Sequence, residues 1–317
     1  MKKIKIIKNR SDIGAGTRGS DMGIDAIEIA AINKNSNFFD RYEFEDVITE
    51  NESIYNKVNN SFAKRIESVF NQCKRLSNHV KVNLQEGKFP VVLSGDHSSA
   101  LGTVSGIKAA NHQNRVGVIW IDAHGDLHSP YTSPSGNIHG MPLAAIIADD
   151  NLECQINDVS RETAEFWERM KNIIVPGQKT LAEDVVFFGV RDTEEPENKQ
   201  IKRHSIKNYK VAEVRHRGLE LCVKEALDSL SNCDVIYISF DVDAMDCDLI
   251  SYGTGTPVSK GFDPNEISTI IKQLLASKKV VCIEFAEINP LLDFKGNKMA
   301  ETAFDILNTI TESIEKL

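Results

Sequence analysis

Residues 116–126 read Val-Gly-Val-Ile-Trp-Ile-Asp-Ala-His-Gly-Asp, and this stretch decides the fold class. It begins with a near-continuous apolar run, which is typical of a strand covered on both faces. Acidic and imidazole side chains follow directly after the run ends at Ile121. Because ligands bind at the carboxyl ends of the strands in open parallel sheets, the stretch predicts a buried strand with a functional site at its end.

Similar apolar runs recur along the chain, and helix-like stretches separate them. Amphipathic segments at 54–85, 217–229 and 300–317, together with a helix start at Pro264, predict the helices. This alternation predicts an α/β fold with three layers, αβα, around a mostly parallel sheet of about eight strands. No linker or repeat divides the chain, so residues 1–317 are expected to form a single domain. The predicted strands are 3–7, 90–93, 116–121, 185–190, 234–240 and 280–285, with weaker ones near 46–48 and 209–214.

The composition excludes several classes of protein. The chain has 317 residues, 41% of them hydrophobic, and no apolar run approaches the length that a membrane span needs. Lysines interrupt the apolar residues of 1–8, which argues against a signal peptide. The net charge of -9 argues against binding to a nucleic-acid backbone. The six cysteines form no C-x-x-C pair, which predicts reduced thiols and a cytoplasmic location.

Three other predicted strands are also followed by acids or imidazoles. The segment Ser94-Gly95-Asp96-His97-Ser98 comes after 90–93, Asp241-Val242-Asp243 comes after 234–240, and Glu287 follows 280–285. A single Asp at a strand end is usually a helix cap or a solvated turn. Acids and imidazoles at the same end of several parallel strands are hard to attribute to capping, and they predict one shared site.

The spacing of these residues predicts a dinuclear metal centre. In an extended segment the side chains at i, i+2 and i+4 share a face, so 122, 124 and 126 should converge, as should 241 and 243. With His97 they supply two imidazoles and four carboxylates, which would repel each other strongly without cations. Oxygen donors outnumber nitrogen donors and no thiolate set is nearby, which favours Mn²⁺ over a structural Zn²⁺. Two such ions could share a bridging water and yield hydroxide near neutral pH.

With these motifs, the chain resembles the ureohydrolases, the family of arginases, agmatinases and formimidoylglutamases. The resemblance extends from Gly14 to Pro290, and residues 94–98, 122–126 and 239–247 are similar to the family's G-G-D-H-S, D-A-H-x-D and S-F-D-V-D-x-x-D-P motifs. It implies a single α/β domain, two Mn²⁺ per subunit, and hydrolysis of a guanidino or amidino C–N bond. It also implies a homotrimer or homohexamer.

The resemblance further assigns the metal ligands. Asp122 and Asp241 would bridge the two ions, and Asp246 would support the metal loop. One manganese would be bound by His97, Asp122, Asp126 and Asp241, and the other by Asp122, His124, Asp241 and Asp243.

Two further segments resemble arginases and imply a substrate with an α-amino acid tail. The element Ser135-Gly136-Asn137-Ile138-His139-Gly140 resembles arginases more than agmatinases. In that resemblance Ser135 and Asn137 hold the α-carboxylate, and His139 is a proton shuttle at the mouth of the site, a role that suits an imidazole. The segment 191–197 resembles the arginase R-D-x-D-x-x-E pattern, so that Glu194 and Glu197 would receive the α-amino group.

A third segment and a lone acid would contact the guanidinium. The turn Thr254-Gly255-Thr256-Pro257 matches the family's T-G-T-P element near that group, which makes Thr256 a substrate contact. Glu287 matches the acid that hydrogen-bonds the guanidinium, and a carboxylate can pair with that planar group bidentately.

The chain also departs from the arginase pattern. Ser94 replaces a Gly, Cys247 replaces a Pro, and one residue is added before the T-G-T-P turn, but none of these changes removes a ligand. His128 stands where arginases have an Asn that contacts the α-carboxylate, and Glu194 stands where they have Asp. Both changes lie in the shell that recognises the amino-acid tail, so they bear on the substrate and not on the chemistry.

The favoured function is hydrolysis of L-arginine to L-ornithine and urea by a metal-bridging hydroxide. Asp126 would pass the proton of the nucleophile to the leaving amine, as a positioned carboxylate can. Glu287 would stabilise the intermediate, and His139 would exchange protons with bulk water. The alternatives are a ureohydrolase for agmatine, guanidinobutyrate or formiminoglutamate, a metal-binding regulator without activity, and a deacetylase on a related fold.

Overall fold

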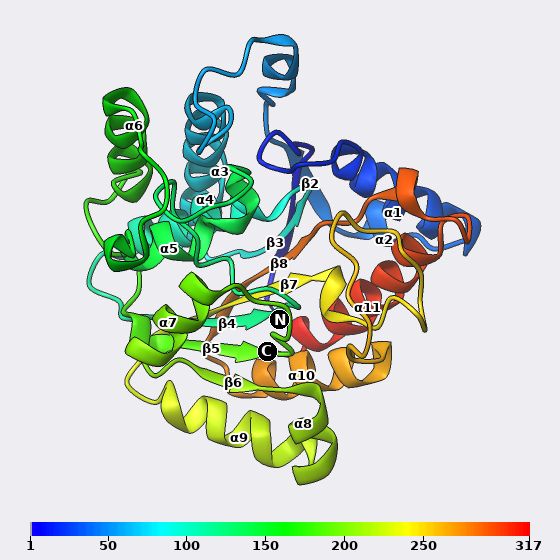
Figure 1. The fold of residues 1–317 in the computed structure, drawn as a ribbon. Helices are drawn as coiled ribbons and strands as arrows, with labels where there is room; N and C mark the ends of the chain where they lie inside the picture. Colours follow the sequence, from blue (N-terminus) through cyan, green and yellow to red (C-terminus); the bar gives the residue numbers. More distant parts are fainter. Residues whose placement is uncertain (1) are drawn as a thin grey trace.

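The computed structural model describes residues 2–317, and eight strands of that range form one sheet in which every neighbouring pair is parallel (Figure 1). The spatial order is β2-β1-β3-β8-β7-β4-β5-β6. The α/β prediction is therefore confirmed. The strands are β1 (Ile4–Asn9), β2 (Glu43–Asp46), β3 (Phe89–Ser94), β4 (Val116–Ile121), β5 (Val185–Phe188), β6 (Lys207–Tyr209), β7 (Val235–Asp241) and β8 (Val280–Ala286).

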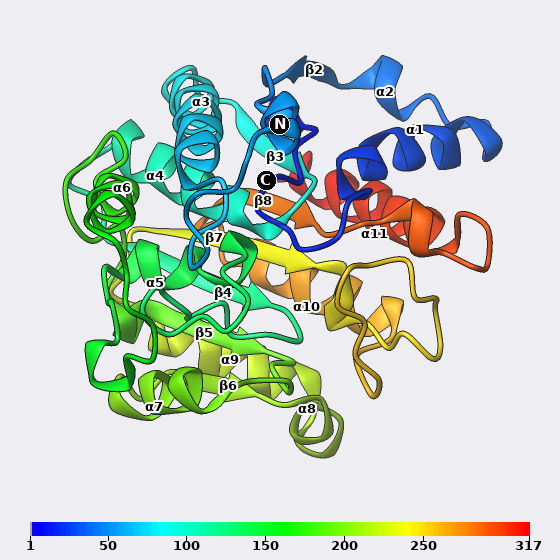
Figure 2. The ribbon, with the colours of Figure 1, turned by 45° about the horizontal axis from the view of Figure 1, so that its top comes forward.

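Helices cover both faces of this sheet (Figure 2). One layer contains α1 (Gly23–Asn33), α9 (Leu219–Ser229), α10 (Pro264–Ala276) and α11 (Lys298–Ile314). The opposite layer contains α3 (Ile66–Gln85), α4 (Ala100–Ala110), α5 (Pro142–Ile147) and α6 (Arg161–Lys171). The remaining helices are α2 (Phe38–Arg41), α7 (Glu195–Arg203) and α8 (Val211–Arg217). Within residues 2–317, no helix is both long and apolar enough to cross a membrane.

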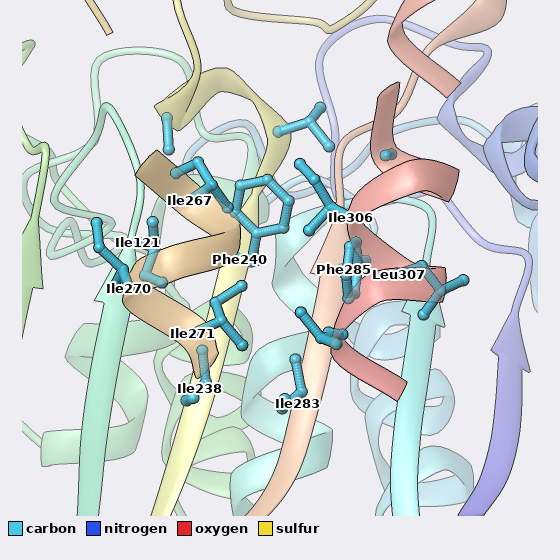
Figure 3. Packing of buried hydrophobic residues seen from close by; sticks show 14 of the residues in the cluster. Ile121, Ile238, Phe240, Ile267, Ile270, Ile271, Ile283, Phe285, Ile306 and Leu307 are labelled. Atoms are coloured by element: carbon cyan, nitrogen blue, oxygen red, sulfur yellow. The ribbon is translucent and has the colours of Figure 1, made fainter. Parts of the chain in front are cut away.

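Strand β4 shows why its sequence is apolar without alternation. Every residue of the strand is buried, because successive side chains enter opposite cores. Ile119 and Ile121 pack with α9 and α10, whereas Val118 and Trp120 pack with α4 and α5. Figure 3 shows the first of these cores, where strand residues meet the apolar stripes of two helices. The residues labelled there include Ile121, Ile238 and Phe240 from the sheet and Ile267, Ile270, Ile271, Ile306 and Leu307 from α10 and α11.

Several predicted boundaries are wrong at polar or glycine-containing segments. The helix predicted over 54–85 begins only at Ile66, because residues 56–61 are rich in Asn and Ser, which favour turns. Likewise, Gly218 has φ +95° and separates α8 from α9 inside the predicted helix 217–229.

The two weaker predicted strands are also misplaced. The strand expected at 209–214 is only Lys207–Tyr209, and the next residues form α8, in which Val211 and Val214 are buried at helical spacing. The strand expected at 46–48 is Glu43–Asp46, an edge strand rich in acids that pairs with β1. Charged edge strands carry little apolar signal, because one side of the strand is not covered by a neighbour.

Candidate metal centre and cavity

The side chains predicted to form the site come from four strands that lie side by side at the centre of the sheet. These strands are β3, β8, β7 and β4, in that spatial order. Because all four are parallel, their carboxyl ends meet at one edge. His97 follows β3, Glu287 follows β8, Asp241 ends β7, and Asp122 follows β4. The sheet order thus brings together residues that are far apart in the sequence.

His97 lies at the centre of the first group of ligands. Its Nδ1 atom is 3.0 Å from Asp122 Oδ2, 3.1 Å from Asp126 Oδ2 and 3.2 Å from Asp241 Oδ2. The imidazole stacks on Trp120 with ring centroids 4.2 Å apart and an interplanar angle of 13°. On its other side, His97 Nε2 is 2.6 Å from the hydroxyl of Ser239. The Nδ1 nitrogen therefore faces three carboxylates, while Nε2 has a hydrogen-bond partner in Ser239.

His124 organises a second group that shares Asp122 with the first. Its Nδ1 atom lies 3.1 Å from Asp243 Oδ2 and 3.6 Å from Asp122 Oδ1. The ligand atoms of His97, Asp122 and Asp241 lie within 4.8 Å of one another, as do those of Asp122, His124 and Asp243. Two adjacent cation positions with Asp122 between them fit this arrangement.

The ligands converge, but not through the extended backbone that the sequence suggested. β4 ends at Ile121, and Asp122 turns its carboxylate back to accept a hydrogen bond of 2.7 Å from the His124 N–H. Asp126 has φ +49°, a left-handed conformation that residues other than Gly rarely adopt. This local backbone strain, rather than i, i+4 alternation along a strand, accompanies the approach of Asp126 to His97.

The pair 241 and 243 shows the same correction. β7 ends at Asp241, and its carboxylate accepts a hydrogen bond of 2.9 Å from the Asp243 N–H. Residues 242–244 form a single turn of 3₁₀ helix. The two carboxylates thus approach the site by a tight turn, with Asp241 toward His97 and Asp243 toward His124.

The buried charges of the site perturb each other in a way that cations would relieve. Burial, followed by repulsion from Asp122, raises the pKa of Asp126 to about 7. Burial and repulsion from Asp243 and Asp122 raise the pKa of Asp241 well above its ordinary value. Burial lowers the pKa of His97, but the surrounding carboxylates outweigh it and raise that pKa well above its ordinary value.

The donor set fits a pair of divalent cations. His97 Nδ1 and Asp122 Oδ2 are buried and have no hydrogen-bond partner, although they face each other. A single N–H could not satisfy three carboxylates, whereas a cation could bind the lone pairs of all four groups. Carboxylate oxygens outnumber imidazole nitrogens here, which suits a hard ion such as Mn²⁺.

Glu287 joins His139 to the metal site. Glu287 Oε1 lies 3.0 Å from His139 Nδ1 and accepts a hydrogen bond of 2.9 Å from the His97 N–H. Burial lowers the pKa of His139, but the charge of Glu287 and its hydrogen bond outweigh this effect and raise the pKa to about 9. Within residues 2–317, the second oxygen, Glu287 Oε2, has a single hydrogen-bond partner, the Ser20 hydroxyl at 3.5 Å. That oxygen is the one best placed to accept a hydrogen bond from a ligand.

An N-terminal loop holds His139 in place. The His139 N–H donates to the Gly14 carbonyl at 3.1 Å, and the Gly14 N–H donates to Asp96 Oδ2 at 2.8 Å. A Cβ atom on Gly14 would lie only 2.6 Å from the Ser98 hydroxyl, so no other residue fits without a shift. This loop belongs to the site even though it contributes no predicted ligand.

A cavity of about 270 Å³ opens over the candidate metal centre. Its base is formed by ligand side chains, and its rim carries the segments predicted to bind the substrate tail. Asp122 is the one predicted site residue in 2–317 that does not line it, because it is buried beneath. The predicted residues that line the cavity are His97, His124, Asp126, His128, Ser135, Asn137, His139, Glu194, Glu197, Asp241, Asp243, Thr256 and Glu287.

His128 and the two acids of segment 191–197 meet at one wall of the cavity. His128 Nε2 lies 3.4 Å from Glu194 Oε2 and 3.7 Å from Glu197 Oε2, while its Nδ1 lies 3.1 Å from the Thr132 hydroxyl. Glu197 also has a structural role, because it accepts hydrogen bonds from the N–H groups of Leu127 and Glu194. Glu194 is the more exposed acid, with a side chain 56% accessible.

Several other predicted residues make hydrogen bonds within the protein itself. The Ser135 hydroxyl accepts a hydrogen bond from the Asn137 N–H, and the buried Asn137 Oδ1 has no partner. Thr256 lines the cavity, but its hydroxyl donates to Asp243 Oδ2 at 3.1 Å. The Asp246 side chain accepts from the Asp248 N–H at 3.1 Å, so it braces the loop that follows the ligands.

The sequence reading missed the groups that support the ligands from behind. Ser239 contacts His97, and Glu284 lies fully buried on β8 among hydroxyl groups. Both residues interrupt otherwise apolar strand segments, and a polar residue inside a buried run is the signal that could have identified them. Arg191 belongs to the motif at 191–197, but the sequence pattern does not predict that its guanidinium donates to the carbonyl of Asp243, in the loop that follows β7.

Comparison with known proteins identifies the family and the fold of the chain. The Arginase family model matches residues 2–311. Arginase from Bacillus subtilis (strain 168) is 36% identical over 311 residues, covering 98% of this chain and 97% of its own. A solved structure of arginase from Bacillus caldovelox is 33% identical and superposes with a TM-score of 0.83, covering 98% of both chains. Formimidoylglutamase from Bacillus subtilis shares the fold, with a TM-score of 0.74 at 17% identity over 99% of this chain and 87% of its own.

Proposed function

The chain belongs to the arginase family, whose members are hydrolases of linear amidines, and we propose that it cleaves L-arginine into L-ornithine and urea at a dinuclear manganese centre. The observation that carries the proposal is the pair of ligand groups that share Asp122 beneath a cavity. The wall of that cavity holds two carboxylates, Glu194 and Glu197, which suit the α-ammonium group of an amino acid.

We assign the ligands of the two ions as the family resemblance implies. Asp122 and Asp241 would contact both ions. When bound, the ion pair would lower the pKa of a water molecule and would thereby supply a nucleophile near neutral pH. The first set is His97, Asp122, Asp126 and Asp241, and the second set is Asp122, His124, Asp241 and Asp243.

Three residues of this chain would move protons and orient the reacting group. Asp126, itself a proposed ligand, lines the cavity, so its carboxylate can accept a proton from the nucleophile and deliver it to the leaving amine. Glu287 Oε2 would accept a hydrogen bond from the guanidinium, because Oε1 is occupied by His97 and His139. His139 would then exchange the proton with solvent, since its side chain remains 19% accessible.

The tail of the substrate would lie against the rim of the cavity. Ser135 and Asn137, which both line the cavity, would hold the α-carboxylate by donating from the Ser135 hydroxyl and the Asn137 Nδ2 amide group. Glu194 and Glu197 would bind the α-ammonium group, with His128 beside both acids. Thr256 would contact the guanidinium region while it orients Asp243.

Product release by the Mn²⁺-loaded protein tests this function. We would compare L-arginine, agmatine, 4-guanidinobutyrate and formiminoglutamate, and assay urea, ornithine and formamide. Urea and ornithine from L-arginine alone would support the proposal. Activity confined to another compound would keep the metal chemistry and overturn the assignment of the tail-binding residues.

Replacement of Asp126 tests the chemical step itself. Asp126→Asn should lower turnover by at least about a thousandfold, because the amide cannot accept the proton. Glu153→Gln, an acid exposed on the surface at the Arg203 ion pair, is the matched control and should keep full turnover. Normal turnover by Asp126→Asn would refute its role, and no turnover of any panel compound by the parent protein would favour a regulator without activity.

We also propose that residues 1–317 form a single domain, that the protein is cytoplasmic, and that it assembles as a homotrimer or homohexamer. The six cysteines of the sequence are all buried and free in the structure, which is compatible with a reducing compartment. Light scattering during gel filtration would give the number of subunits, and a monomer would refute the assembly.

A further inference from the structure

Behind His97, a chain of buried polar groups runs back into the sheet, and the proposed reaction does not use it. His97 Nε2 is 2.6 Å from Ser239 Oγ, and the Tyr237 hydroxyl lies 3.1 Å from the same Oγ. Tyr237 in turn donates to Glu284 Oε2 at 2.7 Å. All four residues are at most 1% accessible, and the last three do not line the cavity.

The donors around Glu284 determine which group donates and which accepts in each hydrogen bond of this chain of polar groups. The Ser94 hydroxyl donates to Glu284 Oε1 at 2.6 Å, and the Ser99 hydroxyl lies at the same distance while it also contacts the Asp96 carbonyl. Three hydroxyl groups thus converge on the two oxygens of Glu284 as donors, with the single proton of the Tyr237 hydroxyl directed toward Oε2. The Tyr237 oxygen can then accept a hydrogen bond from the Ser239 hydroxyl.

We propose that Glu284 and Tyr237 are positioning residues that fix the tautomer of His97. With every proton of the chain directed toward Glu284, Ser239 Oγ accepts the His97 Nε2–H, and His97 Nδ1 keeps its lone pair. That lone pair faces the carboxylates of Asp122, Asp126 and Asp241. The inference rests on the proposed metal centre, because only a bound cation would make use of the lone pair.

Two further observations support a role in orientation. Stacking on Trp120 fixes the plane of the imidazole but not which nitrogen carries the proton. The hydrogen-bond chain through Ser239 determines the position of that proton. In addition, the chain reaches only His97, whereas the second imidazole, His124, contacts Asp122 and Asp243 without it. Loss of the chain should therefore weaken one of the two ion positions and spare the other.

Manganese binding by Tyr237→Phe and Glu284→Gln tests the inference. Each variant nearly preserves side-chain volume and removes one link. The matched control is Tyr209→Phe. Tyr209 lies on β6 and is also buried, but its hydroxyl is 3.4 Å from Glu225 and is not part of the hydrogen-bond chain behind His97. Metal content after dialysis and titration against a competing chelator would count the ions and give their affinities. We expect two tightly bound ions in the parent protein and the control, and at least about tenfold weaker binding of one ion in both variants.

The outcomes separate this inference from the function on which it rests. Two ions bound with unchanged affinity in both variants would overturn the inference and leave the metal centre standing. Equal weakening of both ions, together with a lower unfolding midpoint of the metal-free variants, would indicate a merely structural role and would also overturn it. If Glu284→Gln does not fold, Tyr237→Phe decides, because it removes a single oxygen atom. Failure of the parent protein to bind two manganese ions would overturn the proposed metal centre itself.

Discussion

At the scale of single residues, protons compete with cations for the proposed metal ligands. Burial and Asp122 raise the pKa of Asp126 to about 7, and carboxylates raise the pKa of His97 against the effect of burial. Metal binding must displace these protons. Manganese affinity of the metal-free protein should therefore rise between about pH 6 and pH 8, by up to about tenfold per pH unit for each proton released. Chelator competition across this range would measure it, and a flat profile would contradict the expectation.

His128 is the residue on which substrate choice depends most directly. Its Nε2 faces Glu194 and Glu197, so it competes for the acids that would bind an α-ammonium group. We expect His128→Asn to change KM for L-arginine at least about threefold and to leave kcat within about threefold, because it touches the tail and not the ligands. Steady-state kinetics would measure both constants. His112→Asn, an exposed change in the loop before β4, is the control and should alter neither constant.

At the scale of elements, Arg191 joins the loop that follows β5 to the loop that follows β7. Its guanidinium donates to the carbonyls of Asp243 at 2.9 Å, Val258 at 2.8 Å and Ser259 at 3.0 Å, and it makes no ion pair within residues 2–317. Several carbonyls of the loop between β7 and α10 are thus satisfied by one half-buried guanidinium, in place of the ladder bonds that loops lack. The loop that carries Asp243 is held to the 258–259 segment by this side chain.

Removal of that guanidinium should destabilise the protein. Arg191→Met leaves several carbonyls without a donor, and we expect a loss of about 3 kcal/mol in the free energy of unfolding. Urea denaturation of the metal-free protein would measure the change. Arg161→Met is the comparison, since that side chain is 92% accessible on α6, and it should stay within about 0.5 kcal/mol. Equal effects of the two changes would show that Arg191 does not join the loops.

At the scale of the whole molecule, the candidate metal centre should link the stability of the fold to pH and to metal binding. His97, Asp126, Asp241 and His139 all have a raised pKa in the fold, and that of His139 is about 9. A raised folded-state pKa means that stability is present at low pH and is lost as pH rises through that value. The metal-free protein should therefore unfold more easily at pH 9 than at pH 6.

Addition of manganese should reverse this loss. Ions that bind only the folded state at a thousand times their Kd stabilise it by about 4 kcal/mol per site. Thermal unfolding with and without chelator, at both pH values, would measure the two effects. A metal-free protein that is equally stable at pH 6 and pH 9, or that manganese does not stabilise, would contradict this coupling.

The sequence alone determined the layered α/β architecture and indicated most of the residues that gather at the candidate site. Runs such as 116–121 report burial on both faces through local composition, and the acids and imidazoles at their ends mark the edge where ligands bind. A local pattern can indicate burial because a strand that is covered on both faces needs apolar side chains at consecutive positions. The weaker strands failed for the same reason, since an edge strand such as β2 has little apolar pattern to read.

Only the tertiary structure decided which of these residues meet, and how. The order β3-β8-β7-β4 places His97 beside Ser239 and close to Glu284, although about 140 or more residues separate them in the chain. The left-handed backbone of Asp126 brings its carboxylate to His97, and no periodicity predicts that conformation. The physical reason is that strand order and loop conformation are set by packing between distant segments, whereas a sequence pattern reports only the surroundings of its own residues.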